Sequence, residues 1–465
     1  MSIMPASPAF SATTYQQRRK VLREQIGFGQ ILILGNGESS RNFKDNWYPF
    51  RQDSSFLYYF GIDLPDIMGV IDCENDKDYL IGDDLTIDHI IWTGPQPTMS
   101  ELGDKVGIDA ILPSNKIQTI IGNSTHYLPP YRGEHYRQLS EILSRDIDEI
   151  ETDASLPLIK AIVEQRNVKS TDEVIELHKA TNITSAMHLA VMQSARPDMM
   201  EYELVGVAKR IAAEHNVEFS FPPILSKFGQ TLHNHYHGNA ISEGDMVLYD
   251  GGAESHSYYA GDMTRTFPVG KQYTNRQKEI YQIVYDCHRG AVEALAPGKR
   301  YMDIHLDVAR TMVDGLKALG LMKGDTNEAV QAGAHALFFP HGLGHMIGLD
   351  VHDMENLGEV YVGYGDEFEK STQFGLKSLR LGRTLQEGFA LTVEPGIYFI
   401  PELIDKFSSE GQFVEYVNYD KLESYKDFGG IRLEEDFVIT KDGSELLGTP
   451  LASSVEEIEA IRGGI

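Results

Sequence analysis

Four acidic residues and one histidine in the second half of the chain constrain its fold more than any other feature. Each stands beside an apolar or glycine-rich run, in LYDGG (Asp250), GDMTRTF (Asp262), HGLGHMIGLDVH (His345), TVEPG (Glu394) and GGIRLEED (Glu434). A carboxylate beside a buried strand is costly unless it is paired or binds a cation. Because four carboxylates and one imidazole can hold two divalent cations almost neutrally, we expect a fold that gathers these side chains around a dinuclear metal centre.

The first two aspartates flank GGAESHSYYAG, a stretch typical of a hairpin with small residues at its ends. Either aspartate alone would be an ordinary turn residue. The apolar MVLY before Asp250 and the strand-like TRTF after Asp262 favour a buried position for both.

The third segment contains three histidines within twelve positions, His341, His345 and His352. A single histidine in apolar surroundings is usually a hydrogen-bonded core residue, whereas three together, with two aspartates upstream, indicate a site. The glycines between them argue against a helix and so against the helical HExxH device. They would also let the backbone approach a crowded centre.

Two segments of the chain echo each other. EGDMVLYDGG (residues 243–252) and EGFALTVEPG (387–396) each predict a turn, a buried strand and a carboxylate at the end of the strand. In a domain with pseudo-twofold symmetry, such strands could present Asp250 and Glu394 to a shared centre. Strand alternation also places Arg432 on the same face as Glu434. A surface ion pair is the alternative for that last pair, although the flanking residues favour a buried strand.

The length and composition predict a soluble globular protein of two domains. One ordinary core does not serve 465 residues. A net charge of −28 argues against nucleic acid and anionic membrane as partners. Only two cysteines, Cys73 and Cys287, are present, which excludes a disulfide framework and fits a reducing compartment. We find no signal-peptide pattern and no transmembrane run, so we expect a cytoplasmic protein.

The first half of the chain alternates helical and strand-like stretches. Residues 16–25 predict a helix, and residues 30–35 and 67–72 predict strands. The aromatic segment at residues 47–61 is more typical of core than of a ligand site. We therefore expect an α/β domain in this half of the chain.

A domain boundary is expected near residue 165. Ser170 and Glu173 form a capping-box pattern, and a helical pattern follows to about Ala195. We therefore divide the chain into domains at residues 1–165 and 166–465.

The ligand types also indicate the metal. Oxygen-rich coordination with one imidazole suits Mn²⁺ and tolerates Co²⁺, Fe²⁺ or Zn²⁺, and it lacks the thiolates of a structural zinc site. Two cations roughly 3.5–4 Å apart can share a hydroxide and polarise a carbonyl. The residues thus predict a dinuclear metal hydrolase.

These segments together resemble the creatinase, prolidase and aminopeptidase P group of pita-bread metallopeptidases. FRQDSSFLYYFG resembles the N-terminal domain of aminopeptidase P, and the chain from SFPPIL to EEDFVIT resembles the catalytic domain. The resemblance implies an α/β (α+β) protein in which a pita-bread domain with pseudo-twofold symmetry follows the N-terminal domain. It also implies two metal ions, usually manganese.

The resemblance implies a role for each ligand. Asp262 and Glu434 would bridge the two metals, Asp250 would complete one ion, and His345 and Glu394 would complete the other. Glu394 would also carry the proton from the bridging water to the leaving nitrogen.

The resemblance further places several residues around the substrate. His233 matches the histidine near the substrate, His341 and His352 match the pocket histidines that help to stabilise the tetrahedral intermediate, and Arg432 matches the arginine supporting that network. Arg380, in LKSLRLGR, stands where prolidases have an arginine that can hold the dipeptide carboxylate. A solvent-exposed Arg380 is an equally good interpretation.

Three points are left open or depart from the family pattern. The neighbouring His235 and His237 are expected to be bystanders. Asp250 and Asp262 are twelve positions apart, one more than expected, which predicts a β-bulge in the hairpin. The long stretch at residues 353–393 could form a loop over the pocket and change which substrates fit.

The leading interpretation is an Xaa-Pro aminopeptidase that removes the residue before a penultimate proline from short proline-containing peptides. The alternative is a prolidase, which cleaves only Xaa-Pro dipeptides, and a more distant alternative is a non-catalytic binding module. The family resemblance also implies a homodimer or homotetramer.

Overall fold

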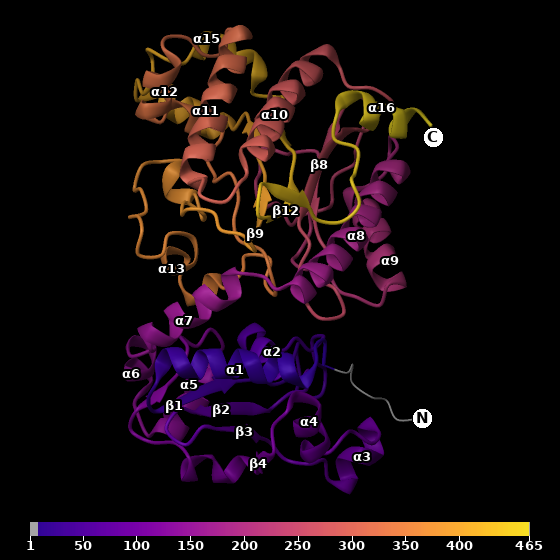
Figure 1. Cartoon of the computed structure of the whole chain (residues 1–465). Coiled ribbons are helices and arrows are strands. Elements are labelled where there is room, and N and C mark those ends of the chain that lie inside the picture. The colour runs from indigo at the N-terminus through magenta and orange to yellow at the C-terminus, as the bar shows by residue number, and fades with distance from the viewer. Residues whose placement is uncertain (1–7, 465) are drawn as a thin grey trace. The chain divides into compact units, whose positions relative to one another are not determined.

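The computed structural model describes residues 8–464, and contacts within it divide the chain into two compact units (Figure 1). The first unit extends to Arg166 and also contains the segment Met354–Tyr361. The second unit consists of Asn167–Asp353 and the chain from Val362 onward. The chain therefore passes between the two units three times, after residues 166, 353 and 361.

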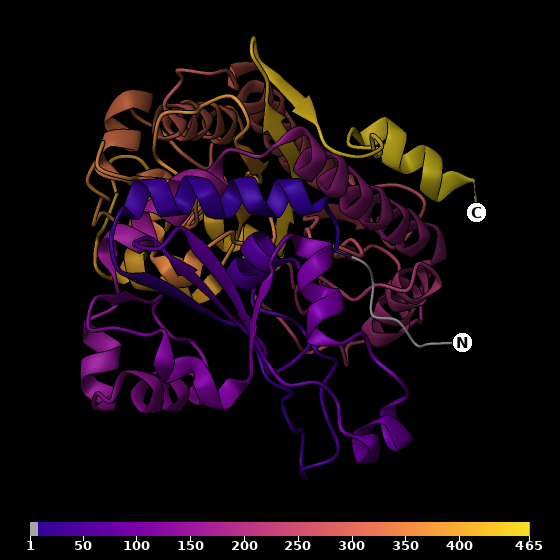
Figure 2. The same cartoon turned by 60° about the horizontal axis from the view of Figure 1, so that its bottom comes forward.

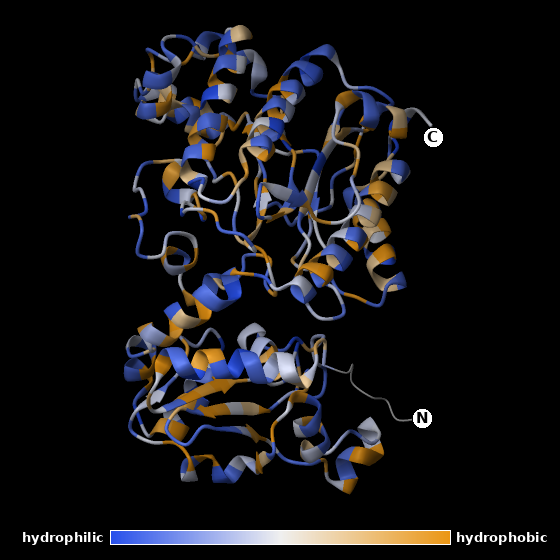
Figure 3. Ribbon diagram, in the orientation of Figure 1, coloured by the Kyte–Doolittle hydropathy of each residue, from blue (hydrophilic) through white to orange (hydrophobic). Residues whose placement is uncertain are grey.

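The first unit is built on a five-stranded sheet whose central strands follow the apolar runs. β1 (Gln30–Leu34) is buried along its whole length and pairs antiparallel with β2 (Met68–Asp72), as expected for residues 30–35 and 67–72. Figure 3 shows these strands in the orange of hydrophobic residues. The strand order is β4-β3-β2-β1-β5, with β3 (Lys77–Ile81), β4 (Ala110–Leu112) and β5 (Thr125–His126).

Helix α1 (Ala12–Ile26) lies across the sheet of the first unit (Figure 2). It confirms the helix expected at residues 16–25. Its start is capped by Ser11, and its end by Gly27 with a φ of 76°. The other helices of this unit are α2 (Ser54–Phe60), α3 (Ile87–Thr93), α4 (Met99–Val106), α5 (Gly133–Leu143), α6 (Ile147–Thr152) and α7 (Leu156–Asn167).

The aromatic segment at residues 47–61 divides into two parts. Phe56, Tyr59 and Phe60, in α2, are fully buried. Trp47 and Tyr48 are 45% and 55% exposed, so the expectation of a core segment is wrong for these two residues. They precede α2 and are not held by its packing.

Helix α8 (Thr171–Ser194) opens the second unit as the capping-box pattern predicts. Ser170 accepts a hydrogen bond from the Glu173 amide, and the Glu173 side chain accepts one from the Ser170 amide. These reciprocal bonds satisfy amides that have no partner inside the helix. The helix ends at the expected position, with Ala195 at its C-cap.

The strands of the second unit form three small sheets, in the orders β6-β7-β8, β13-β12-β9 and β10-β11. An isolated bridge between Thr264 and Glu434 joins the first of these to the segment that links the other two. The strands are β6 (Ile224–Ser226), β7 (Met246–Gly251), β8 (Met263–Pro268), β9 (Ala390–Val393), β10 (Gly396–Tyr398), β11 (Gly430–Arg432), β12 (Glu435–Ile439) and β13 (Ser444–Leu446).

Two helix pairs cover these strands. α8 and α9 (Glu201–Glu214) pack together, with α8 against β7 and β8 and α9 against β6. α10 (Asn275–Ala294) and α11 (Tyr301–Ala318) also pack together, and α10 contacts β9, β10 and β11. The remaining helices of this unit are α12 (Thr326–Ala332), α14 (Pro401–Ser409), α15 (Tyr419–Leu422) and α16 (Val455–Gly463), whereas α13 (Glu359–Gly363) begins in the first unit and ends in the second. Each half of this unit thus combines a helix pair with buried strands.

The echo also holds for the local backbone. Gly244 and Gly388, which precede β7 and β9, have φ values of +91° and +88°, a conformation that favours glycine. Both strands are buried along their whole length. Asp250 lies in the last part of β7, and Glu394 directly follows β9.

The hairpin between the two aspartates contains no bulge, so that expectation is wrong. The pairing keeps one register from Met246↔Pro268 to Gly251↔Met263, and the bridge Glu254↔Ala260 continues it. The extra length is taken up in the turn, where Tyr258 has a φ of 66°. Because Asp250 pairs with Thr264, two residues beyond Asp262, the aspartates are diagonal neighbours on one face.

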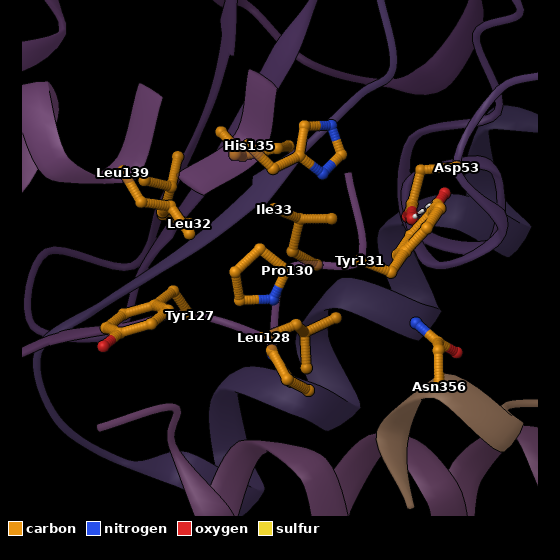
Figure 4. A pocket seen from close by; sticks show the side chains of 12 residues that line it. Leu32, Ile33, Asp53, Tyr127, Leu128, Pro130, Tyr131, His135, Leu139 and Asn356 are labelled. Carbon is orange, nitrogen blue, oxygen red and sulfur yellow. Dashed lines mark hydrogen bonds between the residues drawn. The ribbon is translucent and has the colours of Figure 1, made fainter. Parts of the chain in front are cut away.

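A small cavity of about 30 Å³ lies within the first unit (Figure 4). At its polar edge Tyr131 Oη donates a hydrogen bond of 3.2 Å to Asp53 Oδ2. Asn356, from the segment Met354–Tyr361, forms part of the wall. The volume suits about one or two water molecules, so the cavity marks where this segment packs rather than a ligand site.

No helix of residues 8–464 is both long enough and apolar enough to cross a membrane. Cys73 and Cys287 are free thiols.

Candidate metal centre

A cavity of about 340 Å³ in the second unit is lined by all the side chains that the sequence singled out. This volume falls in the range of small-ligand sites, roughly 300–1,000 Å³. The five candidate metal ligands are Asp250, Asp262, His345, Glu394 and Glu434, and the five other predicted residues are His233, His341, His352, Arg380 and Arg432. Apolar side chains, among them Phe221, Ile224 and Val351, form the rest of the wall.

Strand ends position the four carboxylates. Asp262 directly precedes β8, and Glu434 lies between β11 and β12. The mutual backbone hydrogen bonds of Thr264 and Glu434, 3.4 and 3.1 Å long, hold these two segments together. The pairing of β7 with β8 fixes the position of Asp250. The antiparallel pairing of β9 with β12 fixes the end of β9, which Glu394 directly follows.

His345 comes from the glycine-rich segment, which forms no helix, as predicted. The segment runs along β9, because the Thr392 amide donates to the His345 carbonyl and the Ile347 amide donates to the Ala390 carbonyl. This approach depends on Gly344, where a Cβ would lie 2.1 Å from the Thr392 carbonyl oxygen. A side chain at this position would push the segment away from the strand.

The ring of His345 is oriented for metal binding. Its Nδ1 lies 3.0 Å from the Met346 carbonyl, to which an Nδ1–H donates, and this leaves Nε2 with a free lone pair. Nε2 lies 3.4 Å from Asp262 Oδ2 and 3.7 Å from Glu394 Oε1. Burial lowers the pKa of His345 well below its usual value, so the ring is neutral and able to bind a metal.

Three of the five residues lie close enough together to be candidate ligands of one ion. One ligand atom from each of Asp262, His345 and Glu434 lies within 4.8 Å of the others, and all three residues are buried. Asp250 and Glu394 lie outside this group but line the same cavity. A second cation beside the first would therefore have further carboxylates, those of Asp250 and Glu394, in the same cavity.

The electrostatics of the cluster fit bound cations. Burial, followed by repulsion from Glu434, raises the pKa of Asp262 well above its usual value. Burial, followed by repulsion from Glu394, does the same for Glu434. Burial also raises the pKa of Glu394 to about 7. Buried oxygens of Asp250 and Asp262 have no hydrogen-bond partner, which a metal ion would supply.

A hydrogen-bonded network beside the carboxylates includes Tyr398, a residue that we did not predict. Arg432 donates to Tyr398 Oη at 2.7 Å, and Tyr398 Oη lies 2.8 Å from His341 Nε2. Arg432 also donates to Asp250 Oδ2 at 2.5 Å. His341 Nδ1 lies 3.5 Å from Glu394 Oε2, so the network lies beside this carboxylate.

Strand alternation would not have identified Tyr398. It lies in β10, whereas Glu394 directly follows β9, so the two residues do not share a strand. Three further hydrogen bonds that hold candidate ligand residues in place were also not predicted. Thr264 Oγ1 donates to Glu434 Oε2 at 2.6 Å, Thr392 Oγ1 accepts from the His345 amide at 3.1 Å, and Asp436 Oδ2 accepts from the Asp262 amide at 2.9 Å.

The two histidines expected to be bystanders differ from each other. His235 lines the cavity together with His233. His237 does not line it, and its Nε2 lies 3.2 Å from the Pro223 carbonyl. Arg380 is partly exposed and belongs to the wall of the cavity, so its role in binding a substrate carboxylate stays a prediction.

Comparison with known families is decisive at this point. Residues 176–441, which contain the whole cavity, match metallopeptidase family M24, and residues 15–127 match the aminopeptidase P N-terminal domain. The chain belongs to metallopeptidase family M24. Membership in this family implies a divalent metal centre, and the gathered carboxylates and His345 are chemically suited to one.

Similar M24 proteins align along nearly the whole chain. A human Xaa-Pro dipeptidase is 32% identical over 94% of this chain and 89% of its own length. The Xaa-Pro aminopeptidase of Escherichia coli K12 is 31% identical over 97% of this chain and 98% of its own length. The solved structure of E. coli aminopeptidase P with the inhibitor Pro-Leu superposes with a TM-score of 0.80, at 30% identity, covering 98% of this chain and 99% of that one. The match confirms the mixed helix-and-sheet fold with a C-terminal catalytic region.

Proposed function

We propose that this M24 protein is an Xaa-Pro aminopeptidase, which removes the residue before a penultimate proline from short peptides. The observation that carries the proposal is the single cavity in which four carboxylates, three histidines of the expected pattern and two arginines meet. The similarity to E. coli Xaa-Pro aminopeptidase over nearly the full length of both chains supports the substrate class.

In this proposal, Asp250, Asp262, His345, Glu394 and Glu434 hold two divalent cations, with Mn²⁺ as the expected metal. Such a pair of cations supplies an activated water nucleophile and polarises the scissile carbonyl. Polarisation of the carbonyl needs no N–H in the scissile bond, and the bond before proline has none.

The chain's own residues supply the remaining chemistry. Glu394 lies at the edge of the cluster, 3.5 Å from His341, where it can accept a proton and deliver it to the leaving nitrogen. His233 and His352 line the cavity and can donate hydrogen bonds to substrate oxygens. Arg432 holds Asp250 and Tyr398 in place, and Tyr398 in turn fixes His341.

A second candidate function is an Xaa-Pro dipeptidase. Arg380 in the cavity wall favours it, because a guanidinium there could bind the free carboxylate of a dipeptide. The similarity to human Xaa-Pro dipeptidase points the same way.

The test compares hydrolysis of an Xaa-Pro dipeptide with that of a longer Xaa-Pro-Xaa peptide, before and after chelation. An aminopeptidase cleaves the longer peptide efficiently, a dipeptidase cleaves only the dipeptide, and both lose activity with chelator and regain it with Mn²⁺. A purified protein that contains metal but cleaves neither peptide would contradict both candidates.

We further propose that the domains are residues 1–165 and 166–465, the first of them aminopeptidase P-like. The two family matches, at residues 15–127 and 176–441, support this division.

A homodimer or homotetramer and a cytoplasmic location are also proposed. Light scattering of the purified protein and fractionation of the source cells would test them.

A further inference from the structure

A buried ion pair joins two of the places where the chain passes between its units. Lys169 Nζ lies 2.8 Å from Asp353 Oδ2, and both side chains are only 1% exposed. Lys169 is the third residue of the second unit, and Asp353 is the last residue before the chain leaves that unit. Burying two charges costs desolvation energy, which their attraction offsets only when the two groups are in close contact. A shift of either side chain would therefore be destabilising.

On one side, the pair holds the histidine turn, residues 345–353. The Asp353 amide donates to the Met346 carbonyl at 3.0 Å, and the Asp350 amide donates to Asp353 Oδ1 at 3.4 Å. A Cβ at Gly348 would lie 2.3 Å from Asp353 Oδ2. The carboxylate of Asp353 therefore fits closely against the backbone of the turn and fixes its shape.

On the other side, Lys169 is tied to the strand that leads to Glu394. The Lys169 amide donates to the Gly388 carbonyl at 2.7 Å, and Val168 forms a bridge with Phe389. Gly388 lies two residues before the start of this strand, β9. The ion pair thus links the histidine turn to the backbone that precedes the strand leading to Glu394.

The histidine turn presents two rings to the cavity. His345 and His352 pack edge to face, with ring centroids 4.3 Å apart. His352 is the direct neighbour of Asp353, so a shift of Asp353 would move the His352 ring within the cavity. His345 is also held by Thr392, whose hydroxyl accepts a hydrogen bond from the His345 amide and whose amide donates to the His345 carbonyl.

We propose that Lys169 and Asp353 are positioning residues that set the place of His352 in the cavity. The pair fixes the last residue of the histidine turn, directly before the chain enters Met354–Tyr361. The expected change in kcat rests on the proposed peptidase function, whereas the expected displacement of His352 does not.

The kinetic experiment uses the metal-loaded, full-length Lys169→Met variant with an Xaa-Pro-Xaa peptide. A misplaced His352 should lower kcat by about 10- to 100-fold, with metal content unchanged. In the His352→Ala background, the same substitution should have little further effect on kcat, because the residue that it positions is already gone. The matched control is Lys278→Met, which removes an ion pair of the same 2.8 Å length, with Glu459, and should leave kcat unchanged.

The proposal would be overturned if Lys169→Met lowered kcat by the same factor in the His352→Ala background as in the native chain. Such a result would show a general structural effect that does not act through His352. Loss of bound metal from Lys169→Met would also overturn it, since the effect would then lie at His345. If Lys169→Met does not fold, Asp353→Asn replaces it, because the amide keeps the size and the acceptor of the carboxylate.

A crystal structure of the variant separates this proposal from the proposed function. A displaced His352 supports the positioning role even if the native protein cleaves no Xaa-Pro peptide. A His352 ring that still packs 4.3 Å from His345 in the variant overturns the role, even if the native protein is a fully active aminopeptidase.

Discussion

The Tyr398 hydroxyl lies 2.8 Å from Nε2 of His341 and accepts a hydrogen bond of 2.7 Å from Arg432. Because His341 Nδ1 also lies 2.8 Å from the Gly342 carbonyl, both ring nitrogens are engaged and the ring has one orientation. Burial, followed by the charge of Arg432, lowers the pKa of His341 to about 3. His341 is therefore a neutral, fixed group beside Glu394.

Replacing Tyr398 with Phe should lower kcat/KM about tenfold while metal content stays at two ions per chain. The change leaves a buried Arg432 donor without its acceptor, which costs about 1–3 kcal/mol. Steady-state kinetics and elemental analysis give the two readouts. Tyr281→Phe is the matched control, because Tyr281 is equally buried and donates to the Ser453 carbonyl instead. Equal losses in the two variants would assign the effect to stability alone.

Replacing Asp262 or Glu434 with Ala should abolish activity and reduce bound metal below two ions per chain. Each residue is proposed to contact both ions, so its loss removes more than one coordination bond. Elemental analysis of the purified variants measures the metal directly. Asp245→Ala, which removes a surface contact with Lys227, should bind metal normally. Near-normal activity with two ions retained in either ligand variant would show that the site is wrongly assigned.

Replacing Glu394 with Gln should reduce kcat by orders of magnitude, because an amide neither balances metal charge nor carries a proton. Stopped assays at saturating substrate measure kcat. The exposed Glu402 supplies the control, Glu402→Gln, which should leave kcat unchanged. A loss of less than about tenfold, equivalent to ~1.4 kcal/mol, would show that Glu394 is not the proton carrier.

Replacing Arg380 with Ala separates the two candidate activities. In an aminopeptidase, cleavage of a tripeptide should remain nearly intact, because the substrate carboxylate lies beyond this side chain. In a dipeptidase, Xaa-Pro turnover should fall strongly, because a charge-assisted hydrogen bond contributes roughly 1.5–3 kcal/mol. We expect the aminopeptidase outcome, measured as kcat/KM for both peptides. The exposed Lys377, changed to Ala, controls for general charge removal.

Acid should destabilise the protein through buried neutral histidines. Burial lowers the pKa of His335 and of His288 to about 4. The unfolded chain binds these protons at about 6.5, so stability is complete above that pH and falls as the pH drops toward 4. Both ring nitrogens of His335 are buried without a hydrogen-bond partner, so His335→Leu removes the titrating group without removing a hydrogen bond.

The measurement is the free energy of unfolding against pH, with excess chelator in both samples. His335→Leu should flatten the slope between pH ~6.5 and ~4 by about 1.4 kcal/mol per pH unit. Parallel curves for the variant and the native chain would show that His335 is already protonated in the folded state.

The sequence by itself was sufficient for local structure and for the chemistry of the ligands. Ser170 and Glu173 identified the start of α8, because a capping box is a local hydrogen-bond pattern. The histidine turn could be distinguished from a helix, because its glycines disfavour one. The candidate ligand set could be proposed because buried carboxylates need cations, wherever in the fold they meet.

Only the tertiary structure showed how these parts are held. The hairpin was expected to contain a bulge, yet its register is regular, because one left-handed residue, Tyr258, takes up the extra length in the turn. Trp47 and Tyr48 share the composition of a core segment but lie at the surface, because burial depends on what packs against a residue.

The supports of the site also depend on contacts between distant segments. Asp262 bonds to Asp436, His341 to Tyr398 and Lys169 to Asp353, across separations of 174, 57 and 184 residues. No local pattern encodes such pairs, since they arise only when strands and turns from different parts of the chain pack together. The sequence alone thus determined which groups can do the chemistry, whereas long-range packing decided which neighbours hold them in place.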